Sequence, residues 1–269
     1  MNYELKNSGF SLIEVLLAVG TLAVGMLFVA GVFPVALHFS TLATERSIAA
    51  AVADEAFAKI RLYAIGDPNK AINDEIIQLG ELKEDQLLPD DSIIFADILP
   101  AMKEVIPDEF AYPSTNTDFK TKQYLWSALF RLTERDPNSP VQVTVFVSRK
   151  TNPHLKYRNP EKPEAPSIGL DWPVPVKVKV SQQVGIEDNE LKIENSGYKT
   201  FINDGCTIVD DKTGRLYRVL KRYADKDDMI LLDRDWVGAG PEHIWVVPPA
   251  IGSGRNPCIA IYQKVIRLP

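Results

Sequence analysis

GFSLIEVLLAVGTLAVGMLFVAGVFPVAL, residues 9–37, is the stretch that decides the fold. Only Ser11, Glu14 and Thr21 interrupt its apolar character. A helix needs roughly 20 predominantly apolar residues to cross a bilayer, and this stretch exceeds that length. We therefore expect an N-terminal membrane-spanning helix.

The leader, residues 1–9, predicts the orientation of this helix. It carries Lys6, and a positive charge favours keeping this end in the cytoplasm, so the rest of the chain would face outward. An ordinary secretory signal peptide has a shorter apolar stretch that is followed by small residues at a cleavage site. Here Gly9 precedes the apolar stretch, so cleavage beside it would leave the helix attached.

Glu14 is the one acidic residue in the span. A carboxylate near the membrane interior costs about 2.5–3.5 kcal/mol on insertion scales, which makes it a candidate functional residue. The alternative is a side chain that snorkels to the interface, because Glu14 lies near the start of the span.

Small and polar residues around Glu14 recur at steps of three and four, which places them on one face of a helix. This stripe consists of Ser11, Glu14, Ala18, Thr21 and Gly25. Such a face lets neighbouring helices approach closely in a membrane. The alternative is that glycine and alanine are simply common in spanning helices.

The segment from Gly9 to Ala18 resembles the processing and methylation motif of type IV prepilins and type II secretion pseudopilins. The resemblance implies that a membrane peptidase cuts after Gly9 and methylates Phe10. It also implies that Glu14 pairs with the N-terminal amine of a neighbouring subunit. The continuation through Ala23 to Leu27 resembles minor pilins, and the likeness ends near residue 60.

This resemblance implies a non-enzymatic structural subunit of a type IV pilus-like or type II secretion filament, either a minor pilin or a pseudopilin. Its expected partners are other pilins or pseudopilins, the prepilin peptidase and the assembly platform. The expected location is the inner membrane, with the C-terminal head outside the cytoplasm. The competing hypothesis is a membrane-anchored extracytoplasmic enzyme or binding module that carries a pilin-like anchor.

The helical pattern continues beyond the membrane, so we predict that residues 10–66 form one transmembrane and amphipathic helix. Gly66-Asp67-Pro68 is expected to end it. Pro34 is expected to kink it, because proline lacks an N–H and clashes with the preceding turn. The apolar face after the membrane span comprises Leu42, Ala49, Val52, Ala56, Ile60 and Tyr63.

The remaining chain is predicted to form a mixed connecting region, residues 67–123, and a β-rich globular head, residues 124–269. The connecting region has candidate helices at 71–86 and 96–105. Alternation over 124–133 and 141–149 predicts a hairpin. Further candidate strands, which suggest a small antiparallel sheet or barrel-like module, are 176–183, 205–209, 215–222, 228–233, 242–247 and 257–267. The predicted fold class is α+β, with the long helix packed on the head as in pilins.

The composition and motifs favour a structural protein. A net charge of −6 argues against nucleic-acid binding, which needs basic surface. The sequence contains no HExxH, GxSxG or Walker A motif, so we expect no catalytic residues, metal or cofactor. The acidic group Asp225, Asp227 and Asp228 is read as a hairpin turn, with calcium binding as the alternative.

The cysteines and the tryptophans each allow two interpretations. Cys206 and Cys258 are a disulfide candidate if the head lies in an oxidising compartment; otherwise they are small buried apolar residues. The four tryptophans are read as core or sheet-face residues, with a carbohydrate- or protein-binding face as the alternative.

Overall fold

The computed structural model divides into two compact units, Met1–Ser47 and Ile48–Pro269, which are described separately. The residues that the structure describes are 11–62, 77–78, 110–113, 122–132, 140–150, 152, 154–159, 163, 169–182, 188–223, 228–238 and 241–267.

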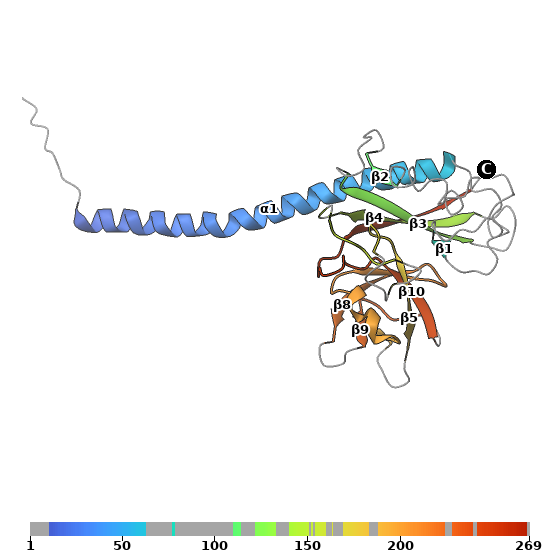
Figure 1. Cartoon of the computed structure of the whole chain (residues 1–269). Coiled ribbons are helices and arrows are strands. Elements are labelled where there is room, and N and C mark those ends of the chain that lie inside the picture. Colours follow the sequence, from blue (N-terminus) through green and yellow to red (C-terminus); the bar gives the residue numbers. More distant parts are fainter. Residues whose placement is uncertain are drawn as a thin grey trace, which may run out of the picture. The chain divides into compact units, whose positions relative to one another are not determined.

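One helix, α1 (Leu12–Leu62), confirms the long N-terminal helix predicted from the sequence (Figure 1). Helical structure continues through Pro34, and Lys59 and Arg61 lie in the last turn, where positive charge complements the helix dipole. The predicted stop at 66–68 and the leader lie outside the described residues.

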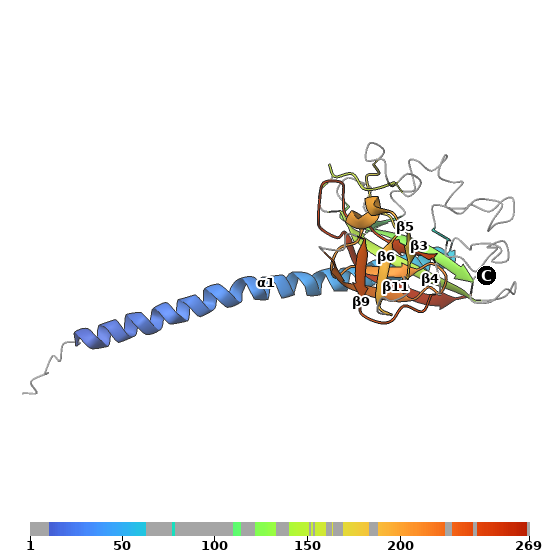
Figure 2. The ribbon, with the colours of Figure 1, turned by 90° about the horizontal axis from the view of Figure 1, so that it is seen from below.

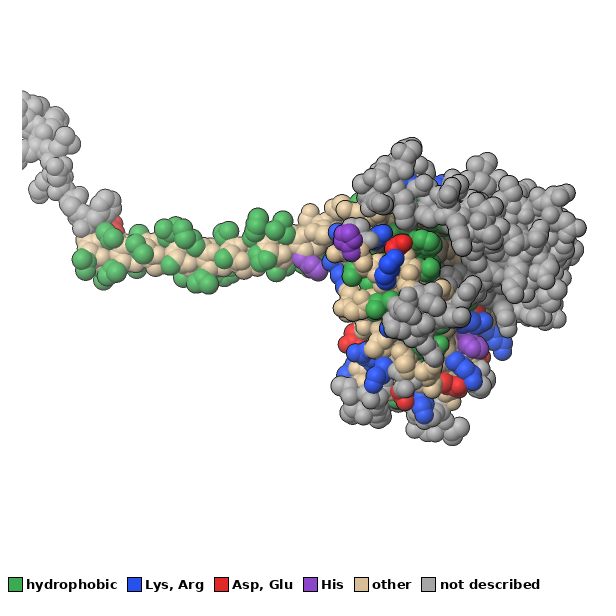
Figure 3. Space-filling model, viewed as in Figure 1, with side chains coloured by type: hydrophobic (Ala, Val, Ile, Leu, Met, Phe, Trp, Pro, Cys, Tyr) green, Lys and Arg blue, Asp and Glu red, His purple; other side chains and the backbone are tan. Residues whose placement is uncertain are grey.

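In the first unit, the large apolar side chains of α1 are exposed from Leu12 to Phe39. Figure 3 shows hydrophobic side chains around this segment, and Leu12, Leu27 and Phe39 are 80%, 73% and 62% exposed. The helix is long and apolar enough to cross a membrane. A single N-terminal helix of this kind indicates membrane anchoring.

The second unit contains an antiparallel sheet in the order β1-β3-β4-β11. Its long strands are β3 (Tyr124–Leu132), β4 (Val141–Arg149) and β11 (Cys258–Ile266). β3 and β4 pair over their full length, which confirms the predicted hairpin. The short strands β1 (Ile77–Gln78) and β2 (Ala111–Tyr112) pair with β3.

The predicted helix at 71–86 is wrong at Ile77 and Gln78, which form β1. Ile77 lies opposite Phe130, and this distant partner leaves no trace in the local periodicity. The rest of 71–86, and all of 96–105, lie outside the described residues.

Six further strands form a closed antiparallel barrel in the order β10-β5-β6-β9-β8-β7, which confirms the barrel-like module (Figure 1). They are β5 (Val176–Ser181), β6 (Glu190–Ile193), β7 (Thr207–Asp210), β8 (Leu216–Arg222), β9 (Met229–Leu232) and β10 (Pro241–Val246). A 3-10 helix, η4 (Ser196–Phe201), follows β6. The strand predicted at 257–267 exists as β11, but it joins the sheet beside β4 rather than the barrel.

Three hydrophobic clusters hold the second unit together. The C-terminal part of α1 packs through Val52, Ala56 and Ile60 against one face of the sheet. A second cluster fills the barrel. A third joins Leu129 and Phe146 of the sheet to barrel and flanking residues, including the fully buried Trp245. Full burial of one large apolar side chain stabilises the fold by about 1.5–3 kcal/mol, so each cluster contributes substantially.

Candidate functional site

Glu14 is exposed in the first turn of α1. The helix begins where the carbonyl of Ser11 accepts hydrogen bonds from the backbone N–H groups of Glu14 (3.0 Å) and Val15 (3.2 Å). A carboxylate near a helix N-terminus gains about 0.3–1 kcal/mol from the helix dipole. That gain is smaller than the insertion cost of about 2.5–3.5 kcal/mol, so the local helix alone does not explain an acid here.

Three residues of the predicted small-residue stripe line one shallow groove along α1. Ala18, Thr21 and Gly25 line it together with Leu22, Met26, Val29, Ala30 and Phe33. The hydroxyl of Thr21 donates to the carbonyl of Ala18 (2.9 Å), so it is satisfied within the helix. Apart from its chain neighbours and the adjoining helix backbone, the described chain has no heavy atom within 4 Å of a Cβ placed on Gly25. Ser11 and Glu14 do not line this groove, and Gly9 and Phe10 lie outside the described residues.

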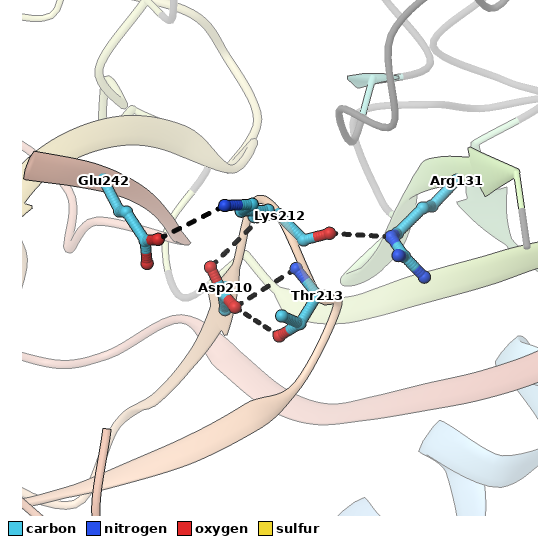
Figure 4. Close-up of polar contacts among 5 residues, drawn as sticks. All are labelled: Arg131, Asp210, Lys212, Thr213 and Glu242. Atoms are coloured by element: carbon cyan, nitrogen blue, oxygen red, sulfur yellow. Dashed lines mark hydrogen bonds and ion pairs between the residues drawn. The ribbon is translucent and has the colours of Figure 1, made fainter. Parts of the chain in front are cut away.

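Figure 4 shows a cluster of polar contacts at the β7–β8 turn. The carboxylate of Asp210 accepts hydrogen bonds from the N–H groups of Lys212 (3.2 Å) and Thr213 (3.1 Å) and from the Thr213 hydroxyl. Gly214 closes the turn at φ +71°, a conformation that glycine adopts without strain.

The same turn is hydrogen-bonded to strands of the sheet. Arg131 Nε of β3 donates to the carbonyl of Lys212 (2.8 Å), as Figure 4 shows. Gln263 of β11 donates to the carbonyl of Gly214 (2.7 Å) and lies 2.9 Å from the Thr144 hydroxyl. These groups are occupied by structural hydrogen bonds, so the cluster joins barrel and sheet. The sequence did not predict this cluster, because its members come from distant strands and only the turn has a recognisable local sequence.

The buried carboxylate of Asp211 lies next to these residues in the chain. Asp211 accepts a hydrogen bond from Trp245 Nε1 (2.6 Å), and Lys177 Nζ lies 2.8 Å from its other oxygen. A buried charge is tolerated when it is paired and hydrogen-bonded in this way.

The tryptophans confirm their interpretation as core and sheet residues. Trp126, Trp236 and Trp245 are 3%, 5% and 0% exposed, and Trp172 is half-buried. Trp126, Trp236 and Trp245 lie in three separate clusters, so these three form no common ligand-binding surface.

The two cysteines are free thiols in the second unit. Cys206 belongs to the barrel core and Cys258 begins β11. The side chain of Asn203 donates to the carbonyl of Gly254 (2.7 Å), which ties together the segments leading to both. Burial raises the pKa of each thiol to about 12, so the reactive thiolate is scarce near neutrality. Whether the two thiols form a disulfide after export stays a prediction.

The acidic turn predicted near residue 225 is only partly described. Asp225 and Asp227 lie outside the described residues, and Asp228 precedes β9. Among the described residues, no three His, Cys, Asp or Glu side chains group as metal ligands would.

Comparison with known proteins found no matching family model, no matching curated protein and no matching solved structure. Function is therefore inferred from the N-terminal helix, its motif and the contacts within the second unit.

Proposed function

We propose that this chain is a structural, non-enzymatic subunit of a type IV pilus-like or type II secretion filament, of the minor pilin or pseudopilin kind. The observation that carries this proposal is Glu14. It is an exposed acid in the apolar stretch of residues 9–37, four residues after Phe10 in a segment that resembles the prepilin motif.

Assembly is explained by the charge of Glu14. Cleavage after Gly9 frees the amine of Phe10, which the peptidase then methylates. Glu14 of one subunit pairs with the amine of its neighbour. In a low-dielectric environment each charge is costly alone and the pair attracts strongly, so pairing rewards one register between neighbouring helices. The groove at Ala18, Thr21 and Gly25 lets the next helix approach closely.

The proposal places the chain in the inner membrane through α1, with the second unit outside the cytoplasm. Its partners are the prepilin peptidase, other pilins or pseudopilins and the assembly platform. The size of the head favours a minor subunit, at a tip or in an initiating complex, over a main structural subunit.

The acids of the second unit support a structural role over the alternative of an anchored enzyme. Asp210 holds the β7–β8 turn, Asp211 bonds to Trp245, and Glu190 accepts a hydrogen bond from the Tyr223 hydroxyl. A carboxylate-based active site would need acids that converge on a cleft and remain available to a substrate.

The N-terminal mass tests this proposal. The full chain is expressed with a prepilin peptidase, and its N-terminus is identified by mass spectrometry. We expect the wild type to begin at a methylated Phe10. Gly9→Val, which places a branched side chain at the cleavage site, should keep residues 1–9, whereas Ser8→Ala should be processed normally. A wild-type chain that keeps its leader beside an active peptidase would overturn the proposal.

A further inference from the structure

The second unit contains a small pocket between three segments of the chain. Arg158, Thr200, Phe201 and residues 249–253 line it, and its volume is about 240 Å³. Thr200 and Phe201 end η4, the short orange coil in Figure 2. Ligand pockets commonly measure about 300–1,000 Å³, so this one suits a ligand smaller than a drug-sized molecule.

Hydrogen bonds hold the walls of this pocket in place. The N–H of Ile251 donates to the carbonyl of Lys156 (2.8 Å), which joins two of the three segments. Arg222 Nη1 of β8 donates to the carbonyl of Lys199 (3.0 Å), which holds η4 on the barrel. Walls that are already fixed lose little conformational freedom when a ligand binds, so the pocket is preorganised for binding.

Arg158 carries the only charge among the residues that line the pocket. Its guanidinium lies over the ring of Phe201, with 5.2 Å between Cζ and the ring centroid, and its Nη1 donates to the carbonyl of Pro163 (3.2 Å). These contacts orient the guanidinium without neutralising it. Within the described chain the half-buried Arg158 makes no ion pair, so its charge is available to an anion in the pocket.

The chemistry of the lining matches a carboxylate attached to a short apolar group. The Nε and Nη2 groups of Arg158 make no hydrogen bond in the described chain, and this edge of a guanidinium binds both oxygens of a carboxylate. One arginine balances the single charge of a carboxylate, whereas a phosphate monoester carries about −1.5 to −2 at pH 7. Pro249, Ala250 and Ile251 supply an apolar wall.

We propose that this pocket is a binding site for a small carboxylate, held by Arg158 and packed against Phe201 and residues 249–251. A free short-chain acid and the last residue of a peptide both present a carboxylate beside an apolar group. Thr200 and Ser253 bring two hydroxyl groups to the same lining. The site lies entirely within the second unit, so the inference does not depend on how the N-terminal helix assembles.

A matched pair of probes tests the role of charge without altering the protein. 3-Methylbutanoate and 3-methylbutanamide have nearly the same shape, and only the first is charged. Isothermal titration into the detergent-solubilised full chain, corrected for detergent alone, should show the acid binding about tenfold or more tightly than the amide, because charge-assisted hydrogen bonds are stronger. Equal affinities, or no binding of the acid at millimolar concentration, would overturn the proposal.

Variants of Arg158 test whether binding occurs in this pocket. Arg158→Gln removes the charge and should weaken 3-methylbutanoate binding about tenfold or more. Arg158→Lys keeps the charge without the planar fork, so it should weaken binding less. Arg234→Gln is the matched control, because Arg234 lies outside the pocket and pairs with Asp233 (3.0 Å). Wild-type affinity in Arg158→Gln, or an equal loss in Arg234→Gln, would contradict the site.

Two further probes identify the source of the carboxylate. N-Acetylglycyl-leucine presents a carboxylate and a branched apolar side chain at the end of a peptide. If it binds more tightly than 3-methylbutanoate and its C-terminal amide does not bind, the pocket receives a chain end; the reverse order of affinities indicates a free acid. Inorganic phosphate that binds more tightly than both acids would overturn the assignment to a carboxylate. These measurements use the wild-type chain, so they remain decisive if Arg158→Gln lowers the thermal midpoint.

Discussion

The two parts of α1 show how one helix serves two environments. Between Leu12 and Phe39 its large apolar side chains are exposed, and Leu27 is 73% exposed. Between Ile48 and Ile60 they lie on one face, and Ile60 is fully buried against the sheet. An apolar surface is stable only when something removes it from water. The second part finds that partner within the chain, so the first part needs lipid or another chain.

The largest expected effect comes from removing the charge of Glu14, in the first part of α1, which should impair assembly and leave the second part folded. Glu14→Gln keeps the side-chain shape and removes the charge, so the partner amine loses its counter-charge. Filament incorporation or crosslinking to partner pilins should fall close to background, while membrane insertion persists because a costly charge is gone.

Glu14→Asp is the matched control. It keeps the charge on a shorter side chain and should restore assembly only partly. The thermal unfolding of the second unit should be the same in all three proteins. Wild-type assembly of Glu14→Gln would show that charge pairing does not set the register.

Truncating one large side chain in each part measures the burial difference directly. Ile60→Ala should lower the free energy of unfolding of the second unit by about 2–5 kcal/mol, because it leaves a cavity against the sheet. Leu27→Ala should leave that unfolding unchanged, because no side chain of the described chain buries it. Thermal melts of the detergent-solubilised full chain provide the measurement, and equal losses in both variants would contradict the comparison.

Enlarging one alanine in each part should give a smaller effect. Ala56 is fully buried, so Ala56→Leu should overpack the interface and cost about 1–3 kcal/mol of unfolding free energy. Ala18 lines the open groove, so Ala18→Leu should leave the unfolding of the second unit unchanged. If helices pack in that groove, Ala18→Leu should still reduce filament incorporation. Normal incorporation would argue against the groove as a contact surface.

The sequence predicted those parts of the fold that have local causes. The apolar length of residues 9–37 predicted the spanning helix, and alternation over 124–133 and 141–149 predicted β3 and β4. The steps of three and four also placed Ala18, Thr21 and Gly25 on one groove. Each of these signals lies within a single helix or strand, where length and side-chain direction can be read from the local sequence.

Elements that depend on distant partners could not be predicted in this way. β6 spans only Glu190–Ile193, and its alternation of charged and apolar residues is too short to predict a strand. β11 pairs with β4, so Ile266 lies opposite Val141, which is far away in sequence. The bond from Arg131 to Lys212 depends on how barrel and sheet dock, which no local pattern reports.

The smallest expected effect concerns the barrel core. Burial raises the pKa of the Cys206 thiol from an ordinary value of 9.0 to about 12. Between these values the unfolded chain loses its proton while the folded chain keeps it, so stability is intact below pH 9 and falls as pH rises. The slope is at most about 1.4 kcal/mol per pH unit for one thiol.

Cys206→Ala tests this assignment, because the variant should lose stability less steeply than the reduced wild type above pH 9. Other groups titrate in this range, so the informative quantity is the difference in slope between the two proteins, measured by denaturant unfolding. Non-reducing mass mapping of the exported chain should accompany it, since a Cys206–Cys258 disulfide would remove the titrating thiol. Parallel slopes in two fully reduced proteins would show that Cys206 is not a buried, protonated thiol.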